Sequence, residues 1–467
     1  MDDLAGRSVL VAGAGVTGTS LARVLTQAGA KVTVTDADAA RLAELEDLGV
    51  DLRPGLAAPP EGTSLVVTSP GWRPSAPLLV TAAAAGIEVI GDVELAWRLG
   101  NARPNPPTWL AVTGTNGKTT TVSMLESMLR AGGVNAIACG NVGFAVLDAV
   151  TEGYPVLAVE LSSFQLHWSS TVAPLAAVVL NVAEDHLDWH GSLASYAAAK
   201  GKIHAHAGTA VYNAQDETST SLALEYGAPG AARIGFTLGA PRAGELGVVE
   251  YLLVDRAFVA DPMRSAEELG TVADVTPHGT HNVANALAAA ALARAYGVTP
   301  DAVRQGLRTF TPGAHRAVEV AEVAGVRYVN DSKATNPHAA SGSLRAHEHV
   351  VWIAGGQLKG ADVDGLVAEV ATRLRGAVLL GVDADVIATA LERHAPDIPV
   401  RKLLSGDDNP MTAAVRAAGA MARPGDVVLL APAAASLDMF RDYEHRGEAF
   451  ADAVRALAVG EHSRGGS

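Results

Sequence analysis

The sequence predicts an α/β protein of three domains, and three observations support this fold class. The 467 residues suffice for about three domains of ordinary size. An apolar strand runs into a glycine-rich turn three times along the chain. Unbroken strands of Val, Leu and Ala alternate with helical patterns, which is typical of parallel sheets covered by helices on both faces. We therefore expect separate sheets, each with its own glycine turn.

The strand, turn and helix units can be assigned in order. In the first unit we expect a strand at Ser8–Ala12, a turn at Gly13–Gly18 and a helix at Thr19–Ala28. In the second unit we expect a strand at Trp109–Thr113, a turn at Gly114–Lys118 and a helix at Thr119–Ala131. In the third unit we expect a strand at Val350–Ala354 and a turn at Gly355-Gly356.

Two turn-rich breaks suggest the domain boundaries. Arg103–Pro107 contains three prolines and cannot continue a helix. Thr309–Gly313 follows helical patterns at Asn282–Tyr296 and Pro300–Thr309. We expect domains at residues 1–104, 105–312 and 313–467, while residues 215–275 contain no recognisable motif.

Composition excludes several function classes. The net charge of −15 is spread without basic blocks, which argues against nucleic acid or anionic membranes as partners. Cys139 is the single cysteine, so no intramolecular disulfide can form. Met1-Asp2-Asp3-Leu4 is acidic where a signal peptide would be basic, and no apolar run approaches the ~18 residues of a membrane span. We expect a cytoplasmic protein.

The turn of the second unit is the strongest local signal. Glycines let backbone N–H groups curl around a phosphate, and the helix that follows adds positive potential. The segment that carries these features is Gly114, Thr115, Asn116, Gly117, Lys118, Thr119 and Thr120. Within it, Lys118 can reach the outer phosphates of a nucleotide, and Thr119 can place its hydroxyl on Mg²⁺. The alternative is a strand–helix turn with a solvated lysine. Because strand, turn and helix occur in this order, the pattern favours a nucleotide-binding loop.

The first turn matches a dinucleotide-binding fingerprint. Gly13, Gly15 and Gly18 have the required spacing, and Asp36 ends the next strand, Lys31–Thr35, where it can bind a ribose hydroxyl. The alternative is close helix–strand packing without a ligand. NAD or a uridine diphosphate would suit the same crevice, so this domain is predicted to be Rossmann-like.

Polar residues follow two further strands of the central domain. Glu160 comes directly after Val156–Val159, where a carboxylate suits Mg²⁺ or caps a helix. His186 follows the strand Ala176–Leu180, within a cluster of His and Asp that suits metal binding, proton transfer or turn formation. Lys200 lies on an alanine-rich helix and by itself predicts a solvated lysine.

Other candidate residues lie on a helix start and on loops of the third domain. Asn282 suits a helix N-cap, whereas Asn285, one turn later, suits an adenine edge. Lys333, Lys359 and Ser436 follow strands and suit a carboxylate-bearing small molecule, although isolated loops with these residues would be ordinary turns.

In this order, the segments resemble the Mur ligase family of peptidoglycan synthesis over nearly the whole chain. Asp331-Ser332-Lys333-Ala334-Thr335-Asn336, together with Ser69-Pro70-Gly71, is similar to the D-glutamate-adding branch. The resemblance implies a Rossmann-like N-terminal domain, a central P-loop-type ATPase domain and a Rossmann-like C-terminal domain. It also implies ligation of D-glutamate to UDP-N-acetylmuramoyl-L-alanine with ATP, two Mg²⁺ sites and a monomer.

The resemblance also implies site residues. It implies that the UDP moiety contacts Val16, Thr17, Asp36 and Gly71, and the muramoyl part Asn141. It implies that ATP contacts Gly114 to Thr120, Asn285, Arg316 and Asp331. One Mg²⁺ is expected at Thr119 and Glu160, and a second at His186 and a carbamylated Lys200. D-Glutamate is expected at Lys333, Thr335, Lys359, Ser436 and the backbone near Tyr443. Lys118, Lys200 and His186 are the expected catalytic residues.

Chemistry explains why such an enzyme needs ATP. A carboxylate repels an amine nucleophile, so it must first become an acyl phosphate, and Lys118 and two Mg²⁺ would offset the charge that accumulates. The competing interpretations are a Mur-type or folylpolyglutamate-type ligase for another amino acid, an NAD-dependent oxidoreductase, and a non-catalytic nucleotide-binding regulator. Lys118 and its loop have no role in the oxidoreductase.

Overall fold

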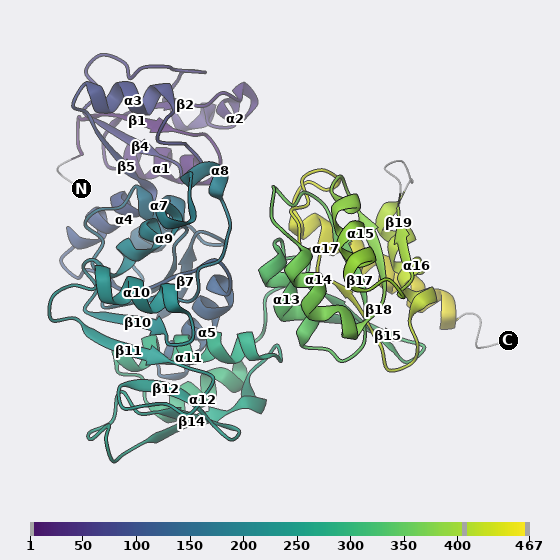
Figure 1. Cartoon of the computed structure of the whole chain (residues 1–467). Coiled ribbons are helices and arrows are strands. Elements are labelled where there is room, and N and C mark those ends of the chain that lie inside the picture. Colours follow the sequence, from purple (N-terminus) through teal and green to yellow (C-terminus); the bar gives the residue numbers. More distant parts are fainter. Residues whose placement is uncertain (1–3, 404–408, 463–467) are drawn as a thin grey trace. The chain divides into compact units, whose positions relative to one another are not determined.

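The computed structural model describes residues 4–403 and 409–462, and within these ranges the strands form three separate sheets with flanking helices (Figure 1). This confirms the predicted three-domain α/β architecture. The chain divides into two compact units. The first runs to Val182 and includes His186–Asp274 and Ala284–Phe310, and the second contains Ala183–Asp185, Val275–Val283 and the chain from Thr311 onwards. The boundaries predicted at residues 104 and 312 stay predictions.

The first sheet is parallel, with strand order β3-β2-β1-β4-β5. Side chains alternate along β1: Val9 and Val11 join the core cluster that contains α1, whereas Leu10 joins the cluster that contains α3. The elements are β1 (Ser8–Ala12), α1 (Val16–Gln27), β2 (Lys31–Thr35), α2 (Ala39–Ala43), η1 (Glu46–Leu48), β3 (Asp51–Leu52), β4 (Leu65–Thr68), α3 (Pro77–Ala84) and β5 (Glu88–Gly91).

The second sheet has strand order β14-β13-β12-β11-β10-β9-β6-β8-β7. Its strands from β7 to β12 run parallel, and β13 and β14 are antiparallel. The elements are α4 (Asp92–Asn101), β6 (Thr108–Thr113), α5 (Lys118–Ala131), β7 (Ala136–Gly140), α6 (Val146–Glu152), β8 (Val156–Glu160), α7 (Ser163–His167), β9 (Ala176–Val179), α8 (Leu187–His190), α9 (Leu193–Gly201), η2 (Lys202–His204), β10 (Thr209–Asn213), α10 (Glu217–Tyr226), β11 (Ala232–Phe236), β12 (Glu245–Val249), β13 (Leu252–Asp255), β14 (Glu267–Thr271), η3 (Val272–Asp274), α11 (Thr280–Tyr296) and α12 (Pro300–Thr309).

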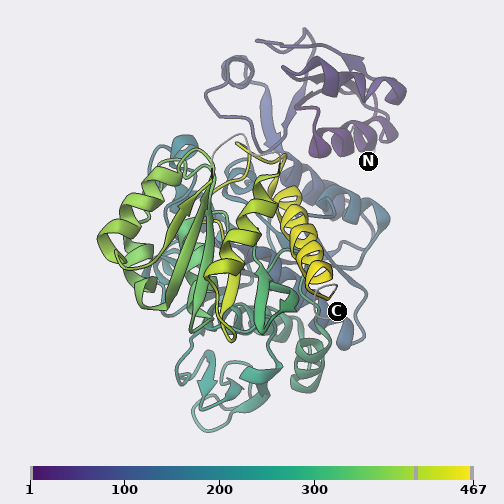
Figure 2. The same cartoon turned by 90° about the vertical axis from the view of Figure 1, so that its right-hand side faces the viewer.

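The third sheet has strand order β15-β16-β20-β17-β18-β19 and is parallel except for the hairpin β15–β16. Helices cover both faces (Figure 2): Trp352 shares a core cluster with α13, α14 and α15, whereas Ile353 shares one with α16 and α17. The elements are β15 (Val318–Val323), β16 (Val326–Asn330), α13 (Pro337–Arg345), β17 (Val350–Gly355), α14 (Asp364–Val370), η4 (Ala371–Arg373), β18 (Leu374–Leu380), α15 (Ala384–His394), β19 (Val400–Lys402), α16 (Pro410–Met421), β20 (Val427–Leu430) and α17 (Tyr443–His462).

Most predicted elements are confirmed to within three residues, and the differences have local causes. The helix expected from Thr19 begins at Val16, because Gly15 is already its extended N-cap. The N-cap role suggested for Asn282 is wrong, since α11 begins at Thr280 and Asn282 is buried within its first turn. Residues 215–275, which showed no motif, form α10 and the strands β11 to β14. In the described part of the chain no helix is long and apolar enough to cross a membrane.

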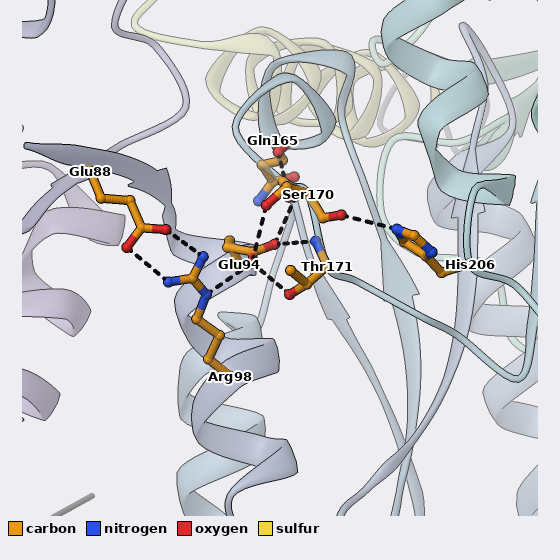
Figure 3. A network of polar contacts seen from close by, with 8 residues as sticks. Glu88, Glu94, Arg98, Gln165, Ser170, Thr171 and His206 are labelled. Carbon is orange, nitrogen blue, oxygen red and sulfur yellow. Dashed lines mark hydrogen bonds and ion pairs between the residues drawn. The ribbon is translucent and has the colours of Figure 1, made fainter. Parts of the chain in front are cut away.

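A polar network ties α4 to the segment after α7 (Figure 3). The Glu94 side chain is completely buried and accepts hydrogen bonds from the backbone N–H groups of Ser170 (2.8 Å) and Thr171 (3.0 Å). It also accepts from Thr171 Oγ1 (2.6 Å) and Arg98 Nε (2.9 Å). Burial raises the pKa of Glu94, but these hydrogen bonds outweigh burial and hold it below its ordinary value. The buried carboxylate is therefore a fixed anchor for this segment.

Candidate active site

The phosphate-loop candidate lies where the strand order of the second sheet reverses. β6 pairs with β8 on one side and with β9 on the other, so the loop after β6 lies between the carboxyl ends of both neighbours. Thr115 N–H donates to Asn181 O (3.0 Å), and Asn116 N–H donates to Asn181 Oδ1 (2.9 Å). Asn181, which the sequence analysis left without a role, therefore shapes the loop.

The loop requires glycine at Gly117. Its φ is +86°, in the left-handed region, and a Cβ there would lie 2.3 Å from Asn285 Oδ1. Asn285 is buried and reaches the loop from α11, so the predicted adenine-contacting residue lies next to the predicted phosphate site. Because the first N–H groups of α5 have no intrahelical acceptor, the helix start fits a phosphate group.

The Lys118 side chain folds back over the loop that precedes it. Its Nζ donates to the backbone oxygens of Gly114 (2.9 Å) and Thr115 (2.8 Å). The cation therefore lies beside the predicted phosphate position, where it can neutralise oxygens that bear negative charge.

Thr119 and Glu160, the predicted metal pair, are in direct contact. Thr119 Oγ1 donates to Glu160 Oε2 (2.6 Å), and Asn141 Nδ2 donates to Glu160 Oε1 (3.0 Å). Glu160 is the last residue of β8 and is 2% exposed. A hydroxyl and a buried carboxylate are hard oxygen donors, so their chemistry fits Mg²⁺.

The expectation that Lys200 by itself is a solvated lysine is wrong. Lys200 is 1% exposed, and its Nζ donates to Gly114 O (2.7 Å) beneath the loop. The amine lies 4.5 Å from the centroid of the Tyr196 ring, and Tyr196 OH lies 3.2 Å from Thr115 Oγ1. The partners of Lys200 include the loop after β6, 86 positions away, which the sequence pattern could not show.

His186 lies beside the same tyrosine. It is the N-cap of α8 with φ +54°, and its ring centroid lies 4.7 Å from Phe164 and 6.4 Å from Tyr196. His190, which sequence reasoning missed, bonds Ser163 Oγ through Nε2 (2.9 Å). Burial lowers the pKa of His190 to about 4, so its ring is neutral at pH 7.

No cluster of three or more His, Cys, Asp or Glu side chains suited to a metal ion occurs among the described residues. Each predicted magnesium site names two residues, Thr119 with Glu160 and His186 with Lys200, so a bound ion would need further oxygen ligands, such as phosphate groups, water or a carbamate.

The four residues predicted to hold the UDP moiety line one pocket of about 420 Å³ in the first domain. Val16 lines this pocket at the start of α1 and is 83% exposed. Asp36 Oδ2 accepts from Ala14 N–H (2.8 Å), which fixes the carboxylate against the glycine turn. Arg41, Ser69 and Trp72 also line this pocket and were not predicted; the pocket residues that were predicted are Val16, Thr17, Asp36 and Gly71.

In the second compact unit, the predicted residues after β16 lie against the start of α17. Lys333 Nζ lies 3.6 Å from the centroid of the Tyr443 ring, and Thr335 N–H donates to Lys333 O (2.8 Å). Asp331 is buried, and burial raises its pKa despite hydrogen bonds from Ser343 and Ala317 and the nearby charge of Arg316.

Arg446, another residue that sequence reasoning missed, joins three loops of this unit. It is 1% exposed and donates to Ser332 O (2.9 Å), Ala434 O (3.0 Å) and Gly355 O (3.5 Å). Burial lowers the pKa of Arg446 to about 10, so it stays charged at pH 7.

The loops that Arg446 holds carry the predicted amino-acid contacts. Lys333 follows Ser332, whereas Lys359 and Ser436 follow the other two attachment points. An antiparallel bridge between Gln357 and Ala435 joins the loops of Lys359 and Ser436 directly. The structure thus brings these predicted side chains to one end of the third sheet.

Three family models match the chain. The Mur ligase MurD-like N-terminal domain matches residues 7–91, the Mur ligase middle domain residues 112–293, and the glutamate ligase domain of Mur ligases residues 315–434.

Similar proteins cover nearly the whole chain. The chain is 58% identical to the UDP-N-acetylmuramoylalanine–D-glutamate ligase of Thermobifida fusca (strain YX), and the alignment covers 98% of this chain and 100% of the relative. It is 56% identical to the ligase of the same name from Streptomyces coelicolor, over 98% of this chain and 99% of the relative.

Solved structures share the fold at low sequence identity. The UDP-N-acetylmuramate–alanine ligase of Thermotoga maritima matches with a TM-score of 0.57 at 19% identity, over 97% of this chain and 99% of that one. A pseudomurein peptide ligase of Methanothermus fervidus matches with a TM-score of 0.60 at 16% identity, over 97% of this chain and 100% of that one.

Proposed function

The chain belongs to the Mur ligase family, and on that premise we propose that it ligates D-glutamate to UDP-N-acetylmuramoyl-L-alanine with ATP in peptidoglycan synthesis. One observation supports this most strongly: a glycine loop with a lysine, a hydroxyl and a buried carboxylate beside it lies in a chain that is 58% identical to a D-glutamate ligase along its length. We place the reaction in the cytoplasm and expect a monomer.

The reaction proceeds in two steps. A carboxylate oxygen of the UDP-linked substrate attacks the γ-phosphorus of ATP, the bond to ADP breaks, and an acyl phosphate forms. The neutral amine of D-glutamate then attacks the carbonyl carbon, the resulting tetrahedral intermediate expels inorganic phosphate, and the proton released from the nitrogen passes to solvent. Both steps bring anions together, so the site must supply positive charge.

The proposed roles follow from the contacts. Lys118, beside the loop oxygens, would turn to the transferring phosphate, and Asn285 would meet adenine next to Gly117. Thr119 and Glu160 would hold one Mg²⁺, and His186 with a carbamylated Lys200 a second. Mg²⁺ would supply charge neutralisation at the phosphate oxygens. Asn141, fixed by Glu160, would meet the muramoyl part.

The other proposed contacts lie in the first domain and in the second unit. The UDP moiety would lie in the pocket of Val16, Thr17, Asp36 and Gly71. Arg316 and Asp331 would contact ATP. D-Glutamate would meet the lysines and hydroxyls that Arg446 holds in place, and these residues are Lys333, Thr335, Lys359 and Ser436, with the backbone near Tyr443.

The test is phosphate release with ATP, UDP-N-acetylmuramoyl-L-alanine and a panel of amino acids. Release should depend on D-glutamate, and Lys118→Ala should lower the rate by about 10²–10³-fold. Lys31→Ala, on an exposed position of β2, is the matched control and should retain the rate of the unmodified enzyme. Equal turnover with L-alanine or meso-diaminopimelate, or full activity of Lys118→Ala, would refute the proposal.

A further inference from the structure

The loop that forms one wall of the first-domain pocket is tied directly to the short helix after His186. Arg73 Nη1 donates to the backbone oxygen of Asp188 (2.9 Å), and Arg73 Nη2 donates to Asp188 Oδ2 (2.8 Å). The two residues lie 115 positions apart in the sequence. One guanidinium therefore connects the predicted UDP site to the segment of a predicted catalytic histidine.

Arg73 is fixed to the pocket wall. Arg73 itself, with Gly71 and Trp72, lines a second pocket that shares Asp36, Gly71 and Trp72 with the first. Pro70 and Pro74 restrict the backbone around it, and Ala76 N–H donates to Arg73 O (2.9 Å) in a tight turn. A movement of the wall would therefore move the guanidinium with it.

The other end of this contact is equally constrained. α8 is a single turn in which His190 N–H donates to His186 O (3.1 Å), so His186 and Asp188 belong to one small rigid element. His190 holds the end of that turn through Ser163, and its ring stacks on Phe164 with a centroid distance of 5.6 Å. With one end of the turn fixed, the bond to Asp188 constrains the rest of the turn, next to His186, whose ring also packs on Phe164.

We propose that Arg73 is a positioning residue for the reaction: it holds His186 in register with the occupied UDP pocket by binding Asp188. The inference rests on the proposed function. The side chains of Arg73 and Asp188 are 53% and 70% exposed, and such an ion pair alone contributes little to stability. Its effect is geometric, because the guanidinium fork binds the main chain and the carboxylate together and so fixes direction as well as distance.

The experiment compares Arg73→Ala with a matched control in the same domain. Arg53 bonds Asp51 at 2.7 Å with side-chain exposures of 51% and 48%, and it does not line either pocket. Arg73→Ala should lower kcat about tenfold and change KM for the UDP-linked substrate less than about threefold, because misplacing a reacting group costs rate more than affinity. Arg53→Ala should leave both values unchanged.

Two further variants test the mechanism of the effect. Asp188→Ala keeps the backbone oxygen and should lose less of kcat than Arg73→Ala. The double variant should be no slower than Arg73→Ala, because both substitutions remove the same contact. The inference would be overturned if the losses of kcat in the double variant were additive. It would also be overturned if Arg73→Ala changed kcat no more than Arg53→Ala does, or changed KM alone.

A binding readout separates this inference from the proposed function. UDP should slow hydrogen exchange of the α8 amides in the unmodified protein and in Arg53→Ala, but not in Arg73→Ala. If D-glutamate-dependent phosphate release is absent while this exchange difference is present, the proposed function fails and the link between pocket and α8 stands. If release is present and the exchange difference is absent, the link fails and the proposed function stands.

Discussion

Removal of the Glu94 carboxylate should destabilise the first compact unit far more than removal of its neighbour Glu88. Glu94 is completely buried and accepts four close hydrogen bonds, one of them from the Arg98 guanidinium. Glu94→Ala leaves the part-buried backbone N–H groups of Ser170 and Thr171 without their acceptor and removes one of the two carboxylates that bind Arg98. Arg98 is 35% exposed and keeps its bond to Glu88, so the main cost is the loss of the acceptor for the two N–H groups. An unsatisfied desolvated group costs about 1–3 kcal/mol, and we expect a loss of unfolding free energy of about 3 kcal/mol.

Glu88 provides the matched control because it binds the same arginine from the surface. Its carboxylate accepts from Arg98 Nη2 at 2.8 Å, but its side chain is 52% exposed (Figure 3). Glu88→Ala should therefore cost at most about 1 kcal/mol. Both variants differ from the unmodified protein by one carboxylate near Arg98, so their difference reports the burial of Glu94 together with its hydrogen bonds to Ser170 and Thr171.

The assay is urea denaturation followed by tryptophan fluorescence at several pH values. Trp97 and Trp109 form an edge-to-face pair with ring centroids 5.3 Å apart beside α4, so the signal reports on this region. Because the folded-state pKa of Glu94 lies below its ordinary value, its contribution is present above the unfolded pKa and is lost as the pH falls through the folded pKa. A Glu94→Ala loss no larger than that of Glu88→Ala, or a loss independent of pH in the acid range, would refute this reasoning.

Three other predictions follow from the structure and the sequence. Asp92 is buried next to Gln165, and burial raises its pKa from 3.8 to about 6, so the protein loses stability as the pH rises from 3.8 to about 6. Asp92→Asn should remove this loss and stabilise the protein by about 3 kcal/mol at pH 7 in the same urea assay. An unchanged pH profile of stability would contradict this prediction. Lys200→Ala should fold but be nearly inactive, and short carboxylic acids should restore part of the activity if Lys200 normally carries a carbamate. Lys202, whose amine bonds His167 O, provides the control, and Lys202→Ala should stay active. Calorimetric titration should detect UDP but not NAD binding to the full chain, and the opposite result would overturn the assignment of the Asp36 pocket.

The sequence by itself determined the features that depend on local chemistry. Apolar runs such as Val350–Ala354 form buried strands because each side chain finds a hydrophobic face on either side of the sheet. Gly117 was recognisable because a tight turn before a helix favours glycine, and its φ of +86° is the conformation that glycine adopts most easily. Lys118 and Thr119 follow that glycine immediately, and their positions at a helix start are fixed by the chain itself.

Only the tertiary structure decided the features that depend on distant partners. Lys200 lies on an alanine-rich helix like many solvated lysines, and its burial results from a bond to Gly114, 86 positions away. Arg446 and Arg73 show no motif, because their acceptors lie far away in the sequence and include backbone oxygens that any residue type would supply. Side-chain periodicity describes one element at a time, whereas burial and long-range hydrogen bonds arise when elements meet, and no local pattern of residues contains that information.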